Sequence, residues 1–123
     1  NSKKEIVIMH CVSCYPCLPE NANLKRLGTL KKIFPKALLG LSDHTQSLII
    51  PAVSASYESY VIEKHFTIDN DLPGRDNKFA LLPNQFEIMV LHHKEAIKAL
   101  IDKGIDYQEC EESTVRNYRG RWG

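Results

Sequence analysis

Three short apolar segments, each followed by a stretch long enough for a helix, constrain the fold of this chain more than any other feature. They are residues 5–12, 37–41 and 59–66. The first contains Ile6-Val7-Ile8-Met9, a run without polar alternation, which is typical of a strand covered on both faces of a parallel sheet. The sequence therefore predicts an α/β fold in which three parallel strands alternate with three helices.

The first two helices are predicted from helical spacing and from proline. Residues 21–34 carry apolar side chains at helical spacing, and Pro35 is expected to end that helix. A second helix is expected to begin within residues 46–51, because proline is tolerated only in the first turn, and to run to about Tyr57.

The third predicted helix begins at residues 82–84 and carries one apolar stripe. The stripe consists of Phe86, Met89, Val90, His93, Ile97, Leu100 and Ile101. Gly104 is expected to cap this helix. Residues 69–76 precede it and predict a loop, because they are rich in turn-forming residues. Residues 105–123 predict a polar, exposed tail.

Composition and charge exclude several classes of protein. The chain has 123 residues, of which 43% are hydrophobic and 25% charged, and its net charge is +1. Neither nucleic-acid binding nor a membrane surface is expected from so balanced a chain, and no apolar run approaches the roughly 20 residues that span a bilayer. The charged segment Asn1–Glu5 is unlike a signal peptide and has no initiator Met, which fits a fragment or a processed chain. The four cysteines are expected to be free thiols in the cytoplasm.

A histidine follows the second and the third predicted strand at the same point. Neighbouring strands lie about 4.8 Å apart, so His44 and His65 could share one divalent ion while Asp43 and Glu63 orient their rings. The alternative is a pair of ordinary buried or hydrogen-bonded histidines. The weaker candidates are His10, His92 and His93.

The pattern Cys11-x-x-Cys14-x-x-Cys17 has the spacing of ligands in an iron–sulfur or zinc site. Cys11 falls inside the first predicted strand, where it is expected to be a small core residue. The fourth cysteine, Cys110, is far along the chain. We therefore expect that these thiols do not form a cluster site.

Two serines and one turn could bind polar groups. Ser13 and Ser42 stand at strand ends before helices, where a hydroxyl and a helix N-terminus could hold a phosphate or a carboxylate. The alternative for both is an ordinary helix cap or turn. Gly74-Arg75-Asp76 could bind a polar ligand, and the alternative is a turn without further role.

Taken together, four motifs resemble those of the sialic acid synthase family, the N-acetylneuraminate synthases and their relatives for other nonulosonic acids. The motifs are His10–Pro16, Gly40–Thr45, Ile62–Thr67 and Leu72–Asp76. The likeness runs from about residue 5 to residue 103. Four motifs in this order and spacing are far more specific than any one of them.

The resemblance implies that residues 1–104 form three consecutive βα units of a (β/α)8 TIM barrel, a partial barrel from the C-terminal part of that domain. Members of the family are transferases of sialic acid biosynthesis that condense phosphoenolpyruvate with an N-acyl amino sugar such as N-acetylmannosamine. The reaction is a metal-assisted, aldol-type C–C bond formation. By this likeness His44 and His65 would bind the divalent ion, usually Mn²⁺. Ser13 and Ser42 would contact phosphoenolpyruvate, and Tyr15 and Asp76 would face the sugar; no side chain is assigned a catalytic proton transfer.

The chain departs from the family pattern in several ways. It lacks the first five barrel strands, the phosphate-binding lysines on them and the antifreeze-like domain; Ser13 replaces an asparagine, and Cys14 and Cys17 stand where other residues are expected. We expect a piece of a synthase that is inactive alone and associates with itself or with the remaining strands, through edges that begin at Ile6 and Tyr60. The alternatives are a non-catalytic α/β binding module derived from such an enzyme, and a cysteine-ligated metal protein.

Overall fold

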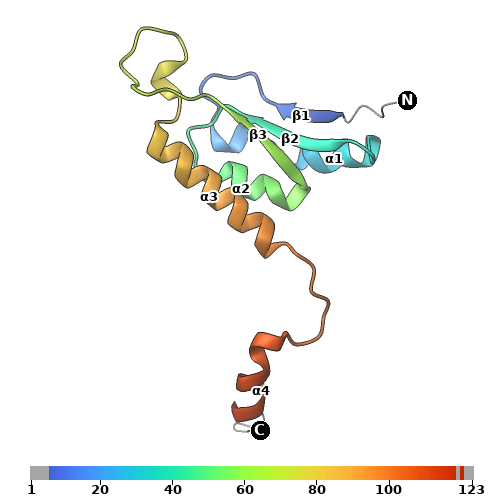
Figure 1. The fold of residues 1–123 in the computed structure, drawn as a ribbon. Helices are drawn as coiled ribbons and strands as arrows, with labels where there is room; N and C mark the ends of the chain where they lie inside the picture. Colours follow the sequence, from blue (N-terminus) through green and yellow to red (C-terminus); the bar gives the residue numbers. More distant parts are fainter. Residues whose placement is uncertain (1–5, 119, 121–123) are drawn as a thin grey trace, which may run out of the picture.

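Three parallel strands form one sheet in the computed structural model, which describes residues 6–118 and 120. The strands are β1 (Val7–Cys11), β2 (Leu38–Asp43) and β3 (Ser59–Lys64), and they lie in the order β1-β2-β3. The predicted α/β fold with parallel strands is therefore confirmed (Figure 1). Across the described residues the sheet does not close, and β1 and β3 are its two edges.

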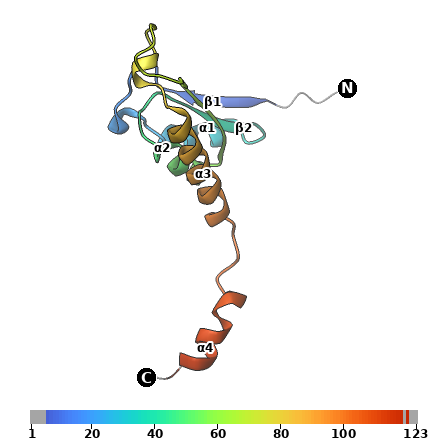
Figure 2. The same ribbon diagram turned by 60° about the vertical axis from the view of Figure 1, so that its left-hand side comes forward.

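The helices follow the strands in the predicted alternation. They are α1 (Lys25–Ile33), α2 (Ile50–Ser54), α3 (Pro83–Ala99) and α4 (Glu112–Tyr118), with 3-10 turns at Pro19–Asn21, Ala55–Tyr57, Asn77–Phe79 and Glu109–Glu111. Helices α1, α2 and α3 all lie on one face of the sheet (Figures 1 and 2). Helix α1 begins later than predicted, at Lys25, and α2 ends at Ser54, where a 3-10 turn takes up the rest of the predicted span to Tyr57.

The two faces of the sheet differ in their surroundings. Residues paired across parallel strands share a face, and successive residues alternate between faces. His10 and Leu41 are paired and each is only 2% exposed, so their row faces the helices. In the next row Cys11 and Glu63 are exposed on either side of Ser42. Within the described residues, one face of the sheet is therefore covered by helices and the other is open.

A glycine allows the strands to approach closely on the open face. A Cβ atom at Gly40 would lie 2.1 Å from Met9 Sδ and 2.9 Å from the carbonyl oxygen of Val61. The pairing of β2 with β3 also shifts between Leu39 and Gly40. Any larger residue at this position would push the Met9 side chain and the β3 backbone apart.

The core lies between the sheet and the helices. Leu27 of α1 and Met89 of α3 are 0% and 1% exposed. Two buried histidines bond to backbone carbonyls: His10 Nε2 lies 2.8 Å from the oxygen of Ala22, and His93 Nε2 lies 2.9 Å from the oxygen of Ser59. These bonds tie β1 and β3 to the helical layer, so both histidines are structural.

The C-terminal part differs from the prediction in detail. Helix α3 ends at Ala99 with Leu100 as its C-cap, so Gly104 does not cap it. Leu100 and Ile101, the end of the predicted stripe, are 53% and 58% exposed. The tail is exposed as expected, but it contains α4, which stands apart from the sheet in Figure 1.

Among the described residues, no helix is both long enough and apolar enough to cross a membrane. Association through the edges at Ile6 and Tyr60 stays a prediction.

Candidate functional site

The histidines that follow β2 and β3 lie side by side. The ring centroids of His44 and His65 are 5.3 Å apart, and the rings are inclined by 57°. Both line a pocket of about 260 Å³ together with Ser42, Glu63 and Lys64. The expected meeting of two imidazoles at the carboxyl end of the sheet is therefore present, whereas metal binding stays a prediction.

The backbone orients the ring of His44. Its Nδ1 lies 2.9 Å from the carbonyl oxygen of Val12. A carbonyl only accepts hydrogen bonds, so Nδ1 carries a hydrogen, and in the neutral tautomer that this bond selects the lone pair is on Nε2. A ring held this way is prepared to bind a metal through Nε2. The Cys11 thiol lies 3.9 Å from the same Nδ1.

A carboxylate faces His65. Asp76 Oδ2 lies 3.8 Å from His65 Nδ1. The strand that ends at Lys64 brings His65 to this place, and the following loop returns so that Leu81 N–H donates to the His65 carbonyl. Asp76, which the resemblance assigns to the sugar, thus stands beside His65; a role toward the sugar stays a prediction.

Two aromatic rings enclose the histidines. The Tyr15 ring centroid lies 4.3 Å from that of His44 and 6.0 Å from that of His65. Phe79 lies 5.2 Å from His65 and 6.1 Å from Tyr15. Sequence analysis missed Phe79, because one apolar residue after a loop carries no signal that it returns to the site. The two rings lie against the histidines but do not line the pocket of about 260 Å³ itself.

Ser42 and Glu63 form a pair of their own. Ser42 Oγ donates to Glu63 Oε1 at 2.6 Å, because the two residues are register partners on β2 and β3. Glu63 was expected to orient a histidine ring, but its carboxylate accepts a hydrogen bond from Ser42 instead. Ser13 lies outside this pocket; its nearest polar contact is the Cys11 thiol, 3.7 Å away.

A buried ion pair lies on the helix side of the same strand ends. Lys64 Nζ donates to Asp43 Oδ2 at 2.5 Å and to the Thr45 carbonyl oxygen at 2.6 Å. Both charged side chains are only 2% exposed. Thr45 N–H and its hydroxyl also donate to the Asp43 carboxylate, at 2.9 and 3.1 Å. Asp43 therefore does not orient a histidine ring, as the sequence suggested, but joins the ends of β2 and β3.

Sequence analysis assigned no role to Lys64, which holds the strand ends beside the site. In the sequence, Lys64 differs only in being a charged residue within a strand whose side chains alternate between the two faces of the sheet. Such a residue must either reach water or find a buried carboxylate. Its register partner Asp43 supplies that carboxylate, which could have been inferred once the register was known.

The three clustered cysteines have separate local contacts. Cys14 Sγ donates to the Pro16 carbonyl and Cys17 Sγ to that of Leu18. Burial raises the pKa of the Cys17 thiol, and the nearby Cys14 and Asp43 add to this rise. Over residues 6–118 and 120, no group of three or more His, Cys, Asp or Glu side chains is arranged to hold a metal ion. A metal at the histidine pair would therefore take two ligands from this part of the chain.

The chain is similar to known proteins over most of its length. Residues 1–104 match the NeuB family. The chain is 45% identical over 87 residues to the spore coat polysaccharide biosynthesis protein SpsE of Bacillus subtilis, covering 70% of this chain and 23% of that protein. It is 36% identical over 105 residues to the pseudaminic acid synthase of Campylobacter jejuni, covering 85% of this chain and 30% of that protein.

A solved structure matches in the same way. The crystal structure of the N-acetylneuraminic acid synthetase of Leptospira borgpetersenii superposes with a TM-score of 0.77 at 30% identity, covering 89% of this chain and 38% of that chain. This match confirms the predicted fold class, a part of a (β/α)8 barrel. The chain spans less than a third of the length of the curated relatives described above.

Proposed function

Because the chain belongs to the NeuB family, we propose that it forms the metal- and acceptor-binding part of a nonulosonic acid synthase. The observation that carries this proposal is the pair His44–His65 at the carboxyl ends of adjacent parallel strands, 5.3 Å apart and beside Ser42. In (β/α)8 enzymes this end of the strands is where the active site lies. Relatives that are named as synthases support an enzymatic role.

The proposed reaction joins phosphoenolpyruvate to the aldehyde of an N-acyl amino sugar. C3 of phosphoenolpyruvate forms the new bond to the aldehyde carbon, and the aldehyde oxygen takes up a proton to become a hydroxyl. Water adds to C2, and the C2–O bond to phosphate then breaks to release inorganic phosphate. When bound at the histidine pair, a divalent ion such as Mn²⁺ would polarise the aldehyde oxygen. The chain covers only part of its relatives, so the remaining phosphate-binding groups are proposed to come from other barrel strands.

The donor set fits such an ion. In the neutral ring His44 would offer Nε2 to the ion, because its Nδ1 hydrogen is committed to the Val12 carbonyl. Asp76 stands at Nδ1 of His65 and favours the same tautomer there. Imidazole nitrogens are accepted by first-row divalent ions, and water or substrate oxygens can complete the coordination. A site with open positions is what a carbonyl-polarising metal needs.

The surrounding side chains would bind the two substrates. Ser42 can donate to a phosphoenolpyruvate oxygen only when its hydroxyl turns away from Glu63, which is its partner in this structure. Ser13 would approach the same substrate from the end of β1. The Tyr15 ring would pack on the sugar, because it already lies against both histidines. Asp76 would bind a sugar hydroxyl while its other oxygen stays near His65.

Manganese titration of the 123-residue chain tests the proposal. We expect one Mn²⁺ per chain, measured from the electron paramagnetic resonance signal of the free ion. His44→Ala and His65→Ala should each weaken binding at least about tenfold. His92→Ala is the matched control, because His92 is exposed on α3 and should leave binding unchanged. A wild-type chain that binds no Mn²⁺, or a His92 variant that loses as much, would contradict the proposal.

A cysteine-ligated metal site is not proposed. The thiols of Cys14 and Cys17 each turn to a neighbouring backbone carbonyl. Thiolate ligands need a low thiol pKa, whereas the pKa of Cys17 is raised by burial.

A further inference from the structure

The loop that follows β1 surrounds His44. The Val12 carbonyl oxygen lies 2.9 Å from His44 Nδ1, and the Cys11 thiol lies 3.9 Å from the same nitrogen. The Tyr15 ring packs on the imidazole with 4.3 Å between centroids, and Cys17 N–H donates to the His44 carbonyl oxygen at 2.8 Å. A change in the path of this loop would therefore move the His44 ring.

Two thiols stand at the ends of a tight turn in this loop. Cys14 N–H donates to the Val12 carbonyl oxygen at 2.9 Å, so the chain turns back around Ser13. An extended path of three residues would span about 10 Å, and the turn shortens this path between Cys11 and Cys14. Their Cα atoms are thereby brought toward the separation of roughly 4.4–6.8 Å that a disulfide needs.

Exposure separates these two thiols from the third one in the loop. Cys11 and Cys14 are exposed, whereas Cys17 is only 4% exposed. An oxidant in solution can therefore reach the first two, because oxidation of a cysteine requires access to its sulfur. Cys110 is also exposed, but it lies in the tail, beyond α3. Its place in the chain makes Cys110 a control for the pair in the loop.

We propose that Cys11 and Cys14 form a reversible disulfide with hydrogen peroxide as the oxidant, and that this bond changes the orientation of His44. Peroxide oxidises one thiol to a sulfenic acid and is itself reduced, with release of water. The second thiol attacks that sulfur, forms the S–S bond and releases a second water. The two sulfurs together give up two electrons, and both thiol hydrogens leave in the waters. A thiol reductant reverses the reaction by exchange.

Closing this bond changes the surroundings of the imidazole. The two sulfurs have different neighbours in the reduced chain: Cys11 Sγ lies 3.9 Å from His44 Nδ1, and Cys14 Sγ donates to the Pro16 carbonyl oxygen. Joining them must move at least one of the two side chains and the turn between them. That turn contains the Val12 carbonyl to which His44 Nδ1 donates. Oxidation of the thiols would therefore weaken the bond that orients the ring.

Peroxide treatment of the 123-residue chain followed by mass spectrometry tests the disulfide. Unreacted thiols are alkylated in denaturant, and trypsin then releases residues 5–25 as one peptide that holds the three clustered cysteines. We expect this peptide to lack two hydrogens and to carry an alkyl group on Cys17 alone. Treatment with a thiol reductant before alkylation should restore three alkylated cysteines.

Two serine variants identify the partners. Cys14→Ser should lose the link, because Cys11 then has no accessible partner in the loop. Cys110→Ser is the matched control, since it removes an exposed cysteine outside the loop, and it should keep the link. Circular dichroism checks that both variants fold, and Cys14→Ala replaces Cys14→Ser if that chain does not. A peptide that stays fully reduced, or a link from Cys14 to Cys17, would overturn the proposal.

The response of His44 is measured separately by nuclear magnetic resonance. The carbon-bound ring hydrogens of the histidines are recorded before oxidation, after it and after reduction, and His44→Ala assigns the His44 signal. We expect this signal to shift on oxidation and to return on reduction, while that of His92, which is exposed on α3, stays in place. A mapped disulfide that leaves the His44 signal unmoved would overturn the coupling to the pocket.

These outcomes are separate from those of the manganese experiment. Neither the mapped disulfide nor the histidine signals require a metal ion. A chain that binds Mn²⁺ without forming the disulfide would keep the proposed function and lose this inference, and a chain that forms the disulfide without binding Mn²⁺ would do the reverse.

Discussion

The two faces of the sheet place neighbouring residues of the same motifs in opposite environments. On the helix side, Asp43 and Lys64 form an ion pair that is 2% exposed at both ends. On the open side, the adjacent residues Ser42 and Glu63 pair at the rim of a pocket. Strand alternation alone produces this division. Asp43 and Lys64 hold the strand ends together, whereas Ser42 and Glu63 line the pocket, to which Lys64 also contributes.

Removing the buried cation of the helix side should give the largest loss of stability. Lys64→Met leaves the Asp43 carboxylate buried without a counter-charge, and such a loss costs about 3–5 kcal/mol. The measurement is the free energy of unfolding in urea. Asp43→Asn/Lys64→Met should recover part of the loss, because no unpaired charge remains.

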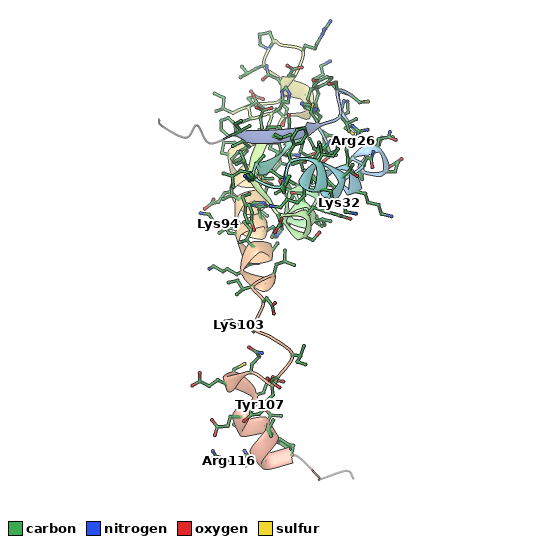
Figure 3. All side chains as sticks on the ribbon, turned by 90° about the vertical axis from the view of Figure 1, so that its right-hand side faces the viewer. Arg26, Lys32, Lys94, Lys103, Tyr107 and Arg116 are labelled. Carbon is green, nitrogen blue, oxygen red and sulfur yellow. The ribbon has the colours of Figure 1, made fainter. Side chains whose placement is uncertain are left out.

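Lys94→Met is the control for that experiment, since Lys94 is exposed on α3 (Figure 3). If the free energy of unfolding of Lys64→Met lies within about 1 kcal/mol of the wild-type value, the ion pair does not hold the strand ends.

Replacing one histidine on each side of the sheet should lower stability in one case and Mn²⁺ binding in the other. His93→Ala removes a buried ring and its bond to the Ser59 carbonyl, which should cost roughly 2–3 kcal/mol and leave Mn²⁺ binding intact. His65→Ala removes a half-buried ring on the open side; it should change stability by less than about 1 kcal/mol and weaken Mn²⁺ binding at least about tenfold. Urea unfolding and Mn²⁺ titration on both variants make the comparison. The reverse pattern would mean that the faces are wrongly assigned.

Alkaline pH should lower the free energy of unfolding through Cys17, which is only 4% exposed. Because burial raises the pKa of this thiol, the folded state holds the proton more tightly than the unfolded state does. The stabilising contribution is complete below the thiol pKa of the unfolded chain, about 8.5, and is lost as pH rises through the folded value. Urea midpoints measured across this range should fall less for Cys17→Ala than for the wild type. Equal slopes in the two chains would contradict the assignment.

An exposed ion pair should give the smallest effect. Lys31 Nζ lies 2.9 Å from Glu58 Oε2, with side chains 40% and 52% exposed. Solvent screening limits such a pair to less than about 1 kcal/mol. Lys31→Met, the same substitution as at Lys64, should therefore barely move the urea midpoint. A loss as large as that of Lys64→Met would show that burial is not what separates the two pairs.

Sequence patterns predicted the elements better than the contacts among them. The apolar runs located β1, β2 and β3, because a parallel strand must bury consecutive residues on its covered part. The alternation also placed His44 and His65 at equivalent strand ends. The contacts of Asp43 and Glu63 were predicted wrongly, because Asp43 faces the helix side with Lys64 and Glu63 bonds to Ser42 across the strands. The positions of Phe79 and Lys64 in the site were missed because their partners are distant in sequence.

By itself, the sequence determined the order of strands and helices and the residues at the strand ends, since hydrophobic periodicity and turn residues act over a few neighbours. Only the tertiary structure decided which side chains meet. The register of β2 with β3 pairs Ser42 with Glu63 and Asp43 with Lys64, and the return of the loop sets Asp76 beside His65. These pairings depend on how whole elements pack, because a shift of one residue would turn each side chain to the other face of the sheet.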